Sequence, residues 1–479
     1  MMTNPPWAGW VILAFVVLCT IGTAQEKIAP VNAQVTGCFT ANCHGSNSTD
    51  GPAWSRAAAT WLIKDPHAHA YSTLMSQWSI EIVAKLSADS IQPSDRFAFR
   101  NFVNDRCATC HATAGQPEVQ LLLGVECQSC HGPTSAWDAS HWNGATSSPS
   151  TANAHSKQRI DLRNLETRVT VCTTCHIGDL NRPQPLEVNH ELIAAGHPPM
   201  YFEFESLWQR MPEHWASDKD IRHLGDTAPF QRWRAGVLLG AAARMQMLAV
   251  RLDRADSVAA LADLNARQHI WPELAEFSCF DCHHERKSSG RSWSQSSKSS
   301  SKAKWDGWTR QAVALLAISS IAEEPHKQLK LISSQFDALA SHLEKPLVNS
   351  SLATRVREFG SGISDQYRQL AAGRPPESDE LRTITQRLLA GKTHSMTWEA
   401  AVQWRMELAA LCESLKMTKL PQHLIDMDSQ LFGLGSGVRP VGIRTASEPS
   451  IASPARFEPS VFESNRLKLI EIFSQDDRR

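Results

Sequence analysis

Apolar residues recur at steps of three and four through the second half of the chain, a spacing that predicts amphipathic helices. The longest such stretch is RWRAGVLLGAAARMQMLAVRL, residues 232–252, with a broad apolar face formed by Trp233, Val237, Leu238, Ala241, Met245 and Leu248. Further rows follow at the same spacing: Leu329, Ile332, Phe336, Leu339 and Leu343; Leu352, Val356, Phe359 and Ile363; and Leu381, Ile384 and Leu388. Prolines lie between these rows. We therefore expect a helical bundle or cap over residues 301–432.

The first part of the chain lacks rows of this length. Residues 25–300 contain short apolar runs and turn-rich stretches such as NGATSSPSTANAHS, a pattern typical of a domain that wraps cofactors. A Ser- and Lys-rich segment at 288–304 predicts a linker or exposed loop. Residues 433–479 predict a mostly disordered tail with a short helix near Asn465 to Phe473. The predicted fold class is mainly α: a loop-rich domain followed by a helical bundle.

The N-terminus predicts export. The apolar stretch WAGWVILAFVVLCTIGTA ends in small residues, and Gly22 and Ala24 suit cleavage before Gln25. Residues 1–24 therefore predict a secretory signal peptide and a location in the periplasm or cell envelope. No Lys or Arg precedes the apolar run, so an uncleaved membrane anchor is the alternative.

Four copies of Cys-x-x-Cys-His follow. They comprise Cys107, Cys110 and His111; Cys127, Cys130 and His131; Cys172, Cys175 and His176; and Cys279, Cys282 and His283. This is the pattern of c-type haem attachment, in which two thiols form thioethers with the haem vinyl groups and the adjacent His ligates the iron. Zinc half-sites and redox pairs are the alternatives, but neither requires a His directly after the second Cys. The four motifs predict four haem attachment sites.

A fifth site is predicted from GCFTANCHGS, where four residues separate Cys38 from Cys43 and His44 follows. In an exported protein these two cysteines could instead form a disulfide. However, Cys43, His44 and Gly45 repeat the Cys-His-Gly at Cys130 to Gly132. The adjacency of Cys and His fixes the imidazole relative to the thioether. We therefore expect haem here too, which makes five covalently attached haem c groups. Cys412 lies in a helical pattern and is expected to be a buried apolar residue.

Function depends on the second axial ligand of each iron, because two His ligands favour electron transfer and an open position favours binding of a small molecule. In KDPHAHAYSTLMSQW, Asp65 and Pro66 predict a helix start that places His67 on the apolar face and His69 on the polar face. His190 is expected in a short helix that ends at Gly196, and His197 in the extended segment after it. His67, His141, His190 and His197 are the predicted distal ligands.

A second group of histidines is less favoured: His155, His214, His223 and His269. Met200 and Met211 are expected to be packing residues rather than axial thioethers. Lys and Arg number 48 against 49 Asp and Glu, which gives a net charge of −1. This balance indicates no nucleic-acid partner. Redox proteins are the expected partners, and membrane anchoring follows only if the signal segment is not cleaved.

Several segments resemble exported multihaem cytochromes of the cytochrome c-554 type. They are DPHAHAYSTL, GVECQSCHGP, CTTCHIGDL, NHELIAAGHPPMYFEFE and WPELAEFSCFDCHH. The resemblance covers roughly His44 to His284. It implies a helical, loop-rich fold with closely packed haems, and bis-His ligation of most irons with His67, His141, His190 and His197 as distal candidates. The chain departs from the family in its five sites, its Cys-x4-Cys-His motif and its helical extension.

Two functions follow from these features. The first is an electron carrier that passes electrons between redox partners at the cell envelope, without catalysis. The second is an oxidoreductase that acts on a small nitrogen or sulfur compound at one five-coordinate haem. Pentahaem nitrite reductases usually carry Lys in place of the attachment-site His at the catalytic haem, whereas all five sites here have His. This difference favours the carrier.

Overall fold

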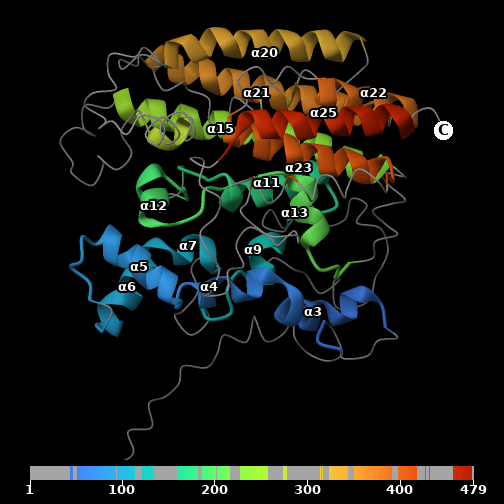
Figure 1. Ribbon diagram of the computed structural model, residues 1–479. Coiled ribbons are helices and arrows are strands. Elements are labelled where there is room, and N and C mark those ends of the chain that lie inside the picture. The colour runs from blue at the N-terminus through green and yellow to red at the C-terminus, as the bar shows by residue number, and fades with distance from the viewer. Residues whose placement is uncertain are drawn as a thin grey trace, which may run out of the picture.

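Figure 1 shows the computed structural model of the chain. The structure describes residues 44–46, 51–92, 94–113, 121–133, 160–181, 186–200, 202–215, 227–256, 273–277, 313, 315–316, 323–343, 350–374, 376–390, 397–417, 427, 431 and 457–476. Within these ranges the regular structure is helical, apart from one isolated antiparallel bridge between Asp179 and Leu186. The predicted mainly-α fold class is confirmed.

Short helices carry the second and third attachment motifs. In chain order they are η1 (Ala53–Arg56), α3 (Ala57–Lys64), η2 (Pro66–His69), α4 (Ala70–Thr73), α5 (Gln77–Leu86), α6 (Arg96–Arg106), α7 (Ala108–His111) and α9 (Cys127–His131). They form the lower part of the molecule in Figure 1. Buried residues such as Tyr71, Val83, Phe99 and Val103 form a small core between them. A core this small leaves the stability of the region dependent on what else it encloses.

A middle layer consists of α11 (Leu165–His176), α12 (His190–Ala195) and α13 (Phe204–Arg210). The short η6 (Leu274–Glu276) follows later in the chain. As expected, α12 ends at Gly196. Polar side chains fix the starts of these helices: Asn164 accepts the N–H of Thr167, and Asn189 accepts that of Leu192, each at 3.0 Å. Such caps satisfy amide donors that the helix itself leaves unpaired.

The long helix predicted at 232–252 is α15 (Ala228–Asp256). It is long and apolar enough to cross a membrane, but 78% of its apolar window is buried inside the protein. Its closest partner is α21 (Ser350–Ala372), and it also packs against α11, α13 and α23 (Trp398–Ser414). A buried ion pair ties it to α13, because Arg232 donates to both carboxylate oxygens of Glu205, at 2.5 and 2.7 Å. This helix is therefore the core helix on which the middle layer rests.

The C-terminal helices α20 (Glu323–Leu343), α21, α22 (Ser378–Ala390), α23 and α25 (Pro459–Asp476) form the upper part of the molecule in Figure 1 together with α15. They share one continuous apolar core with α11 and α15. The helix expected near Asn465 to Phe473 is longer than predicted. Its Phe462, Leu469 and Phe473 are at most 1% exposed, so it joins the bundle, which extends beyond the expected boundary near residue 432.

Other predictions fall outside the described residues. These are the signal peptide at 1–24, the Ser- and Lys-rich segment, the cysteines Cys38, Cys43, Cys279 and Cys282, and the histidines His141, His155, His223, His269 and His283.

Two glycines of α21 test how closely this helix approaches α15. A Cβ atom at Gly360 would lie 2.8 Å from the Met245 Cβ, whereas one at Gly362 meets no atom within 4 Å. We expect Gly360→Ala to lower the free energy of unfolding by about 1–3 kcal/mol, because the two helices must separate. Gly362→Ala should raise it by about 0.5–1 kcal/mol, since Ala favours the helix. Chemical denaturation followed by far-UV circular dichroism checks both, and equal effects would contradict the close approach.

Candidate haem sites

Three attachment motifs lie on short helices or at the end of a longer one. Cys127, Cys130 and His131 all belong to α9, and Cys172, Cys175 and His176 form the last turn of α11. Residues three and four positions apart on a helix project from the same face. The helical backbone therefore presents both thiols and the imidazole of each motif to one side, as covalent attachment to a single haem requires.

Each of these motif histidines has a second histidine ring opposite it. His67 lies opposite His176 with the ring centroids 6.2 Å apart, and His197 lies opposite His111 at 6.3 Å. His214 lies opposite His131 at 6.4 Å. The partners in each pair come from distant parts of the sequence, so the tertiary fold creates these pairs.

The spacing fits a metal ion held between the two rings. Two metal–imidazole bonds of about 2.0 Å, with roughly 1.1 Å from each ring nitrogen to its centroid, put collinear rings about 6.2 Å apart. All three pairs match this distance. Within the residues that the structure describes, no three His, Cys, Asp or Glu side chains form another metal-binding cluster. The donor set therefore fits haem iron with two axial imidazoles and does not favour zinc half-sites.

Hydrogen bonds at the other ring nitrogen orient these imidazoles. The His111 Nδ1 lies 3.0 Å from the carbonyl oxygen of Ala70, the His197 Nδ1 2.8 Å from that of Pro198, and the His214 Nδ1 3.1 Å from that of Pro212. A carbonyl oxygen accepts only from a protonated nitrogen, so these contacts assign the proton to Nδ1 and leave Nε2 as the ligand atom. His44 makes the same kind of contact, with its Nδ1 2.7 Å from the Trp54 carbonyl oxygen.

Electrostatics also favours neutral ligands. Burial, with a smaller contribution from His67, lowers the pKa of His176 to about 4, and burial is the main cause of the lowered pKa of His197, also about 4. Only the unprotonated Nε2 of an imidazole can bind a metal ion. Both rings are therefore in the ligand form at neutral pH.

His67 differs from the others because its Nδ1 contacts a carboxylate. The Asp65 Oδ1 lies 2.9 Å from the His67 Nδ1 and accepts the His67 backbone N–H at 2.9 Å. Burial alone would lower the pKa of His67, but the hydrogen bond and charge of Asp65 raise it. The same turn is fixed from the other side, because the Val125 N–H donates to the His67 carbonyl oxygen at 2.9 Å.

Gly124 allows the backbone of its segment to approach the His67 carbonyl oxygen closely enough for the hydrogen bond from Val125. Its φ is +68°, and a Cβ at this position would lie 2.4 Å from the carbonyl oxygen of His67. Only glycine combines this backbone conformation with such an approach. The GVECQSCHGP segment therefore holds the third motif directly against the turn that carries His67.

The attachment thiols also lie close to one another. Interaction with Cys175, followed by burial, raises the pKa of Cys110, and burial followed by the charge of Cys172 raises that of Cys130 to about 12. None of the described motif cysteines forms a disulfide. The second, third and fourth motifs therefore bring their thiols into one region, and all six thiols remain available for thioether formation.

Comparison with known proteins identifies part of the chain. Residues 38–132 match the family model of cytochrome c554 and c-prime. The chain carries a cytochrome c554-type region. Cytochromes of this kind bind haem c covalently and transfer electrons. No curated protein and no solved structure matches the chain.

The cytochrome c554-type region contains the first three motifs and His67, and the partners of these histidines lie beyond it. His176, His197 and His214 all follow residue 132. The axial pairs thus connect the matched region to α11 and to the segments after α12 and α13.

Of the predicted distal histidines, the structure brings His67 and His197 opposite a motif histidine and leaves His69 exposed. His190 begins α12, and its N–H donates to Glu273 Oε1 at 2.8 Å. Among the described residues, no histidine ring lies opposite His190. His141 lies outside the described residues, and His214 occupies the position opposite His131 instead.

Sequence reasoning undervalued His214, although its neighbourhood resembles that of His197. Each follows the end of a short helix and lies within two residues of a proline whose carbonyl oxygen its Nδ1 contacts. Aromatic rings support His214, because Trp215 packs against it at 4.9 Å and stacks on Trp208 at 4.5 Å. The proline, the helix end and the tryptophan beside His214 were the sequence features that could have identified it as a distal candidate.

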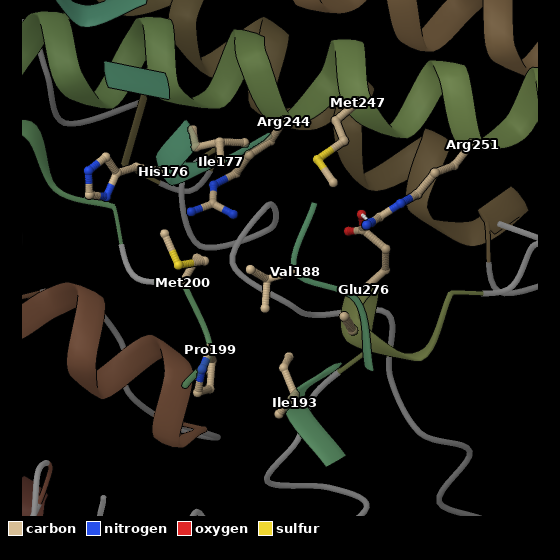
Figure 2. A pocket seen from close by; sticks show the side chains of 11 residues that line it. His176, Ile177, Val188, Ile193, Pro199, Met200, Arg244, Met247, Arg251 and Glu276 are labelled. Atoms are coloured by element: carbon tan, nitrogen blue, oxygen red, sulfur yellow. Dashed lines mark hydrogen bonds and ion pairs between the residues drawn. The ribbon is translucent and has the colours of Figure 1, made fainter. Parts of the chain in front are cut away.

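A hollow opens beside His176 and is lined by Ile177, Val188, Ile193, Met200, Arg244, Met247, Arg251 and Glu276, among others. Figure 2 shows the Arg244 side chain pointing into it toward Met200 and Val188. Arg251 is paired with Glu187 and Glu276. Burial lowers the pKa of Arg244 to about 10, and the charge of Glu276 acts in the opposite direction. Apolar walls with a guanidinium suit an apolar macrocycle that carries carboxylates, such as a haem with its propionates.

Replacement of His214 tests the pair that the sequence did not predict. We expect His214→Ala to convert one low-spin iron to high-spin, because His131 would lose its opposite ligand, without loss of covalently attached haem. Ultraviolet-visible and electron paramagnetic resonance spectra check the spin state. His69→Ala is the matched control, since His69 is exposed. An unchanged spin state in His214→Ala would contradict the pairing.

Proposed function

We propose that this protein is an exported pentahaem electron carrier of the periplasm or cell envelope. The observation that carries this proposal is the set of opposed histidine rings, each pair spaced for one metal ion. Haem iron supplies reversible one-electron chemistry when it is bound. The histidine pairs would fill both axial positions and so keep substrates away from the metal.

The residues around the pairs support electron transfer further. Backbone carbonyls and Asp65 hold the rings in fixed orientations. Ligands that keep their orientation in both oxidation states reduce the rearrangement that each electron transfer requires. The proximity of the thiols of three motifs would place successive haems close together. Redox proteins are the proposed donor and acceptor, with no nucleic acid involved.

The haems of the first and fifth motifs are proposed from less direct observations. The Trp54 carbonyl would orient His44 as the proximal ligand of the haem on Cys38 and Cys43. Glu273 binds the N–H of His190, and Ala275 and Glu276 line the hollow that contains Arg244. Because the chain reaches the motif of Cys279, Cys282 and His283 only a few residues later, we assign this hollow to that haem, with Arg244 as a partner for a propionate.

An oxidoreductase is the second candidate. In this case one of the five haems would keep an open axial position. A small nitrogen or sulfur compound would bind there. The cationic Arg244 side chain beside the hollow favours an anionic compound.

Export is proposed from residues 1–24, whose apolar run and small residues suit cleavage before Gln25. Covalent haem attachment takes place outside the cytoplasm, so export and haem binding support each other. If the segment is not cleaved, it would anchor the cytochrome to the membrane.

Mass spectrometry of the unfolded mature protein tests the number of haems. Thioether bonds survive denaturation, so we expect a mass that includes five haems. Cys43→Ser should prevent normal attachment at the first site, whereas Cys412→Ser, at a buried cysteine outside any motif, should leave all five in place. Four haems together with a disulfide between Cys38 and Cys43 would show that the first site is structural.

Carbon monoxide distinguishes the carrier from the enzyme. An iron with two histidine ligands has no vacant position, so we expect at least four haems of the folded, reduced protein to resist carbon monoxide and at most one to bind it. Difference spectra of the intact protein measure the fraction that responds. Two or more responsive haems, with turnover of nitrite or hydroxylamine, would favour the oxidoreductase instead.

A further inference from the structure

Asp65 occupies an unusual position beside an axial histidine. It is 3% exposed, and it caps η2 by accepting the His67 backbone N–H at 2.9 Å. The same oxygen, Oδ1, lies 2.9 Å from the His67 Nδ1. One buried carboxylate therefore fixes both the backbone and the ring of the histidine opposite His176.

Four other described axial candidates have a different kind of acceptor. His111, His197, His214 and His44 contact the backbone carbonyls of Ala70, Pro198, Pro212 and Trp54. A carbonyl is a neutral dipole, whereas a carboxylate carries a full negative charge. The surroundings of Asp65 have a low effective dielectric constant because it is buried, and this strengthens its attraction for the Nδ1 proton.

This difference has an electronic consequence for the ligand. When the Nδ1 proton is drawn toward a carboxylate, the imidazole becomes more electron-rich and its Nε2 a stronger donor. A stronger donor stabilises ferric iron more than ferrous iron, which lowers the reduction potential. Reduction itself adds one electron at the iron and leaves the Nδ1 proton in the bond between His67 and Asp65.

We propose that Asp65 is a positioning residue that lowers the reduction potential of the haem held between His67 and His176. The inference rests on the proposed axial role of this histidine pair. Asp65 would make this haem harder to reduce than the same haem with a neutral acceptor, and so sets its place in the order in which the haems fill with electrons.

The turn around Asp65 is rigid enough to maintain this contact. The Val125 N–H holds the His67 carbonyl at 2.9 Å, and the Asp65 N–H donates to the Trp61 carbonyl at 3.0 Å. The Trp61 indole in turn donates to the Val125 carbonyl oxygen at 3.1 Å. Asp65 also lies near enough to His214 and Cys130 to interact with them electrostatically. A smaller effect on the haem of the third motif is therefore expected as well.

The test uses Asp65→Asn and Asp65→Ser in the full-length, haem-loaded protein. Asn and Ser cap helices about as well as Asp, so both variants keep the turn and remove the charge. In a spectroelectrochemical titration we expect one component to become easier to reduce. Its ferrous-to-ferric ratio at a fixed potential should rise about tenfold, a shift of about 59 mV for one electron. The haem content and the low-spin state should not change.

Asp95→Asn is the matched control. Asp95 also caps a helix, accepting the Ala98 N–H at 2.9 Å, but it is exposed and contacts none of the described axial histidines. The control should leave the reduction potential of every component unchanged. If both Asp65 variants keep all haems low-spin and no component shifts, the tuning role is wrong and Asp65 only caps the turn.

His67→Ala separates this failure from failure of the proposed function. If His67→Ala leaves the spin state unchanged, His67 is not an axial ligand and the pair itself is wrong. If it produces one high-spin haem while the Asp65 variants do not shift the titration, only the tuning is wrong.

If neither neutral variant retains its haems, a measurement on the unmodified protein still tests the proposal. Near-infrared magnetic circular dichroism of ferric low-spin haem reports the donor strength of the axial ligands through a charge-transfer band. We expect one band at higher energy than the rest, from the haem with the electron-rich His67. A single band position for all the bis-His haems would overturn the proposal.

Discussion

The hydrogen bonds at the Nδ1 atoms of His67, His111, His197 and His214 are the constraint on which the candidate site depends. An imidazole can rotate about two side-chain bonds, and either nitrogen can carry its proton. A carbonyl or carboxylate acceptor fixes both the rotation and the proton position. The acceptors come from turns that the fold holds independently, such as the end of η2 for His111 and the proline segments after α12 and α13 for His197 and His214. The backbone and Asp65 thus specify the orientation of these rings.

The two parts of the molecule contribute differently to the stability of the candidate haem sites. The N-terminal helices have a small core of their own, whereas α11, α15 and the C-terminal helices share a large continuous one. His214 follows α13, which is bound to α15 through Arg232 and Glu205. The larger core therefore supports the segment that places His214 opposite His131.

Sequence patterns predicted local features well and long-range pairings poorly. The apolar rows predicted α15, α20, α21 and α22, and the turn chemistry around Gly196 predicted the end of α12. The cap at Asp65 was visible for a similar reason, since capping depends on neighbouring residues alone. The pairing of His131 with His214 could not be predicted in this way, because 83 residues separate them and the packing of α13 against α15 brings them together. The length of α25 was underestimated because its apolar stripe is recognisable only against the helices that cover it.

The crossed orientation of the paired rings has a consequence of its own. The ring planes of His67 and His176 meet at 89°, and those of His111 and His197 at 90°. If the two rings held a haem iron, perpendicular imidazoles would direct their π orbitals at different d orbitals, whereas parallel rings would act on the same one. The two d orbitals would then be nearly equal in energy. A haem held in this way would be less selective about the direction from which a neighbouring redox centre approaches.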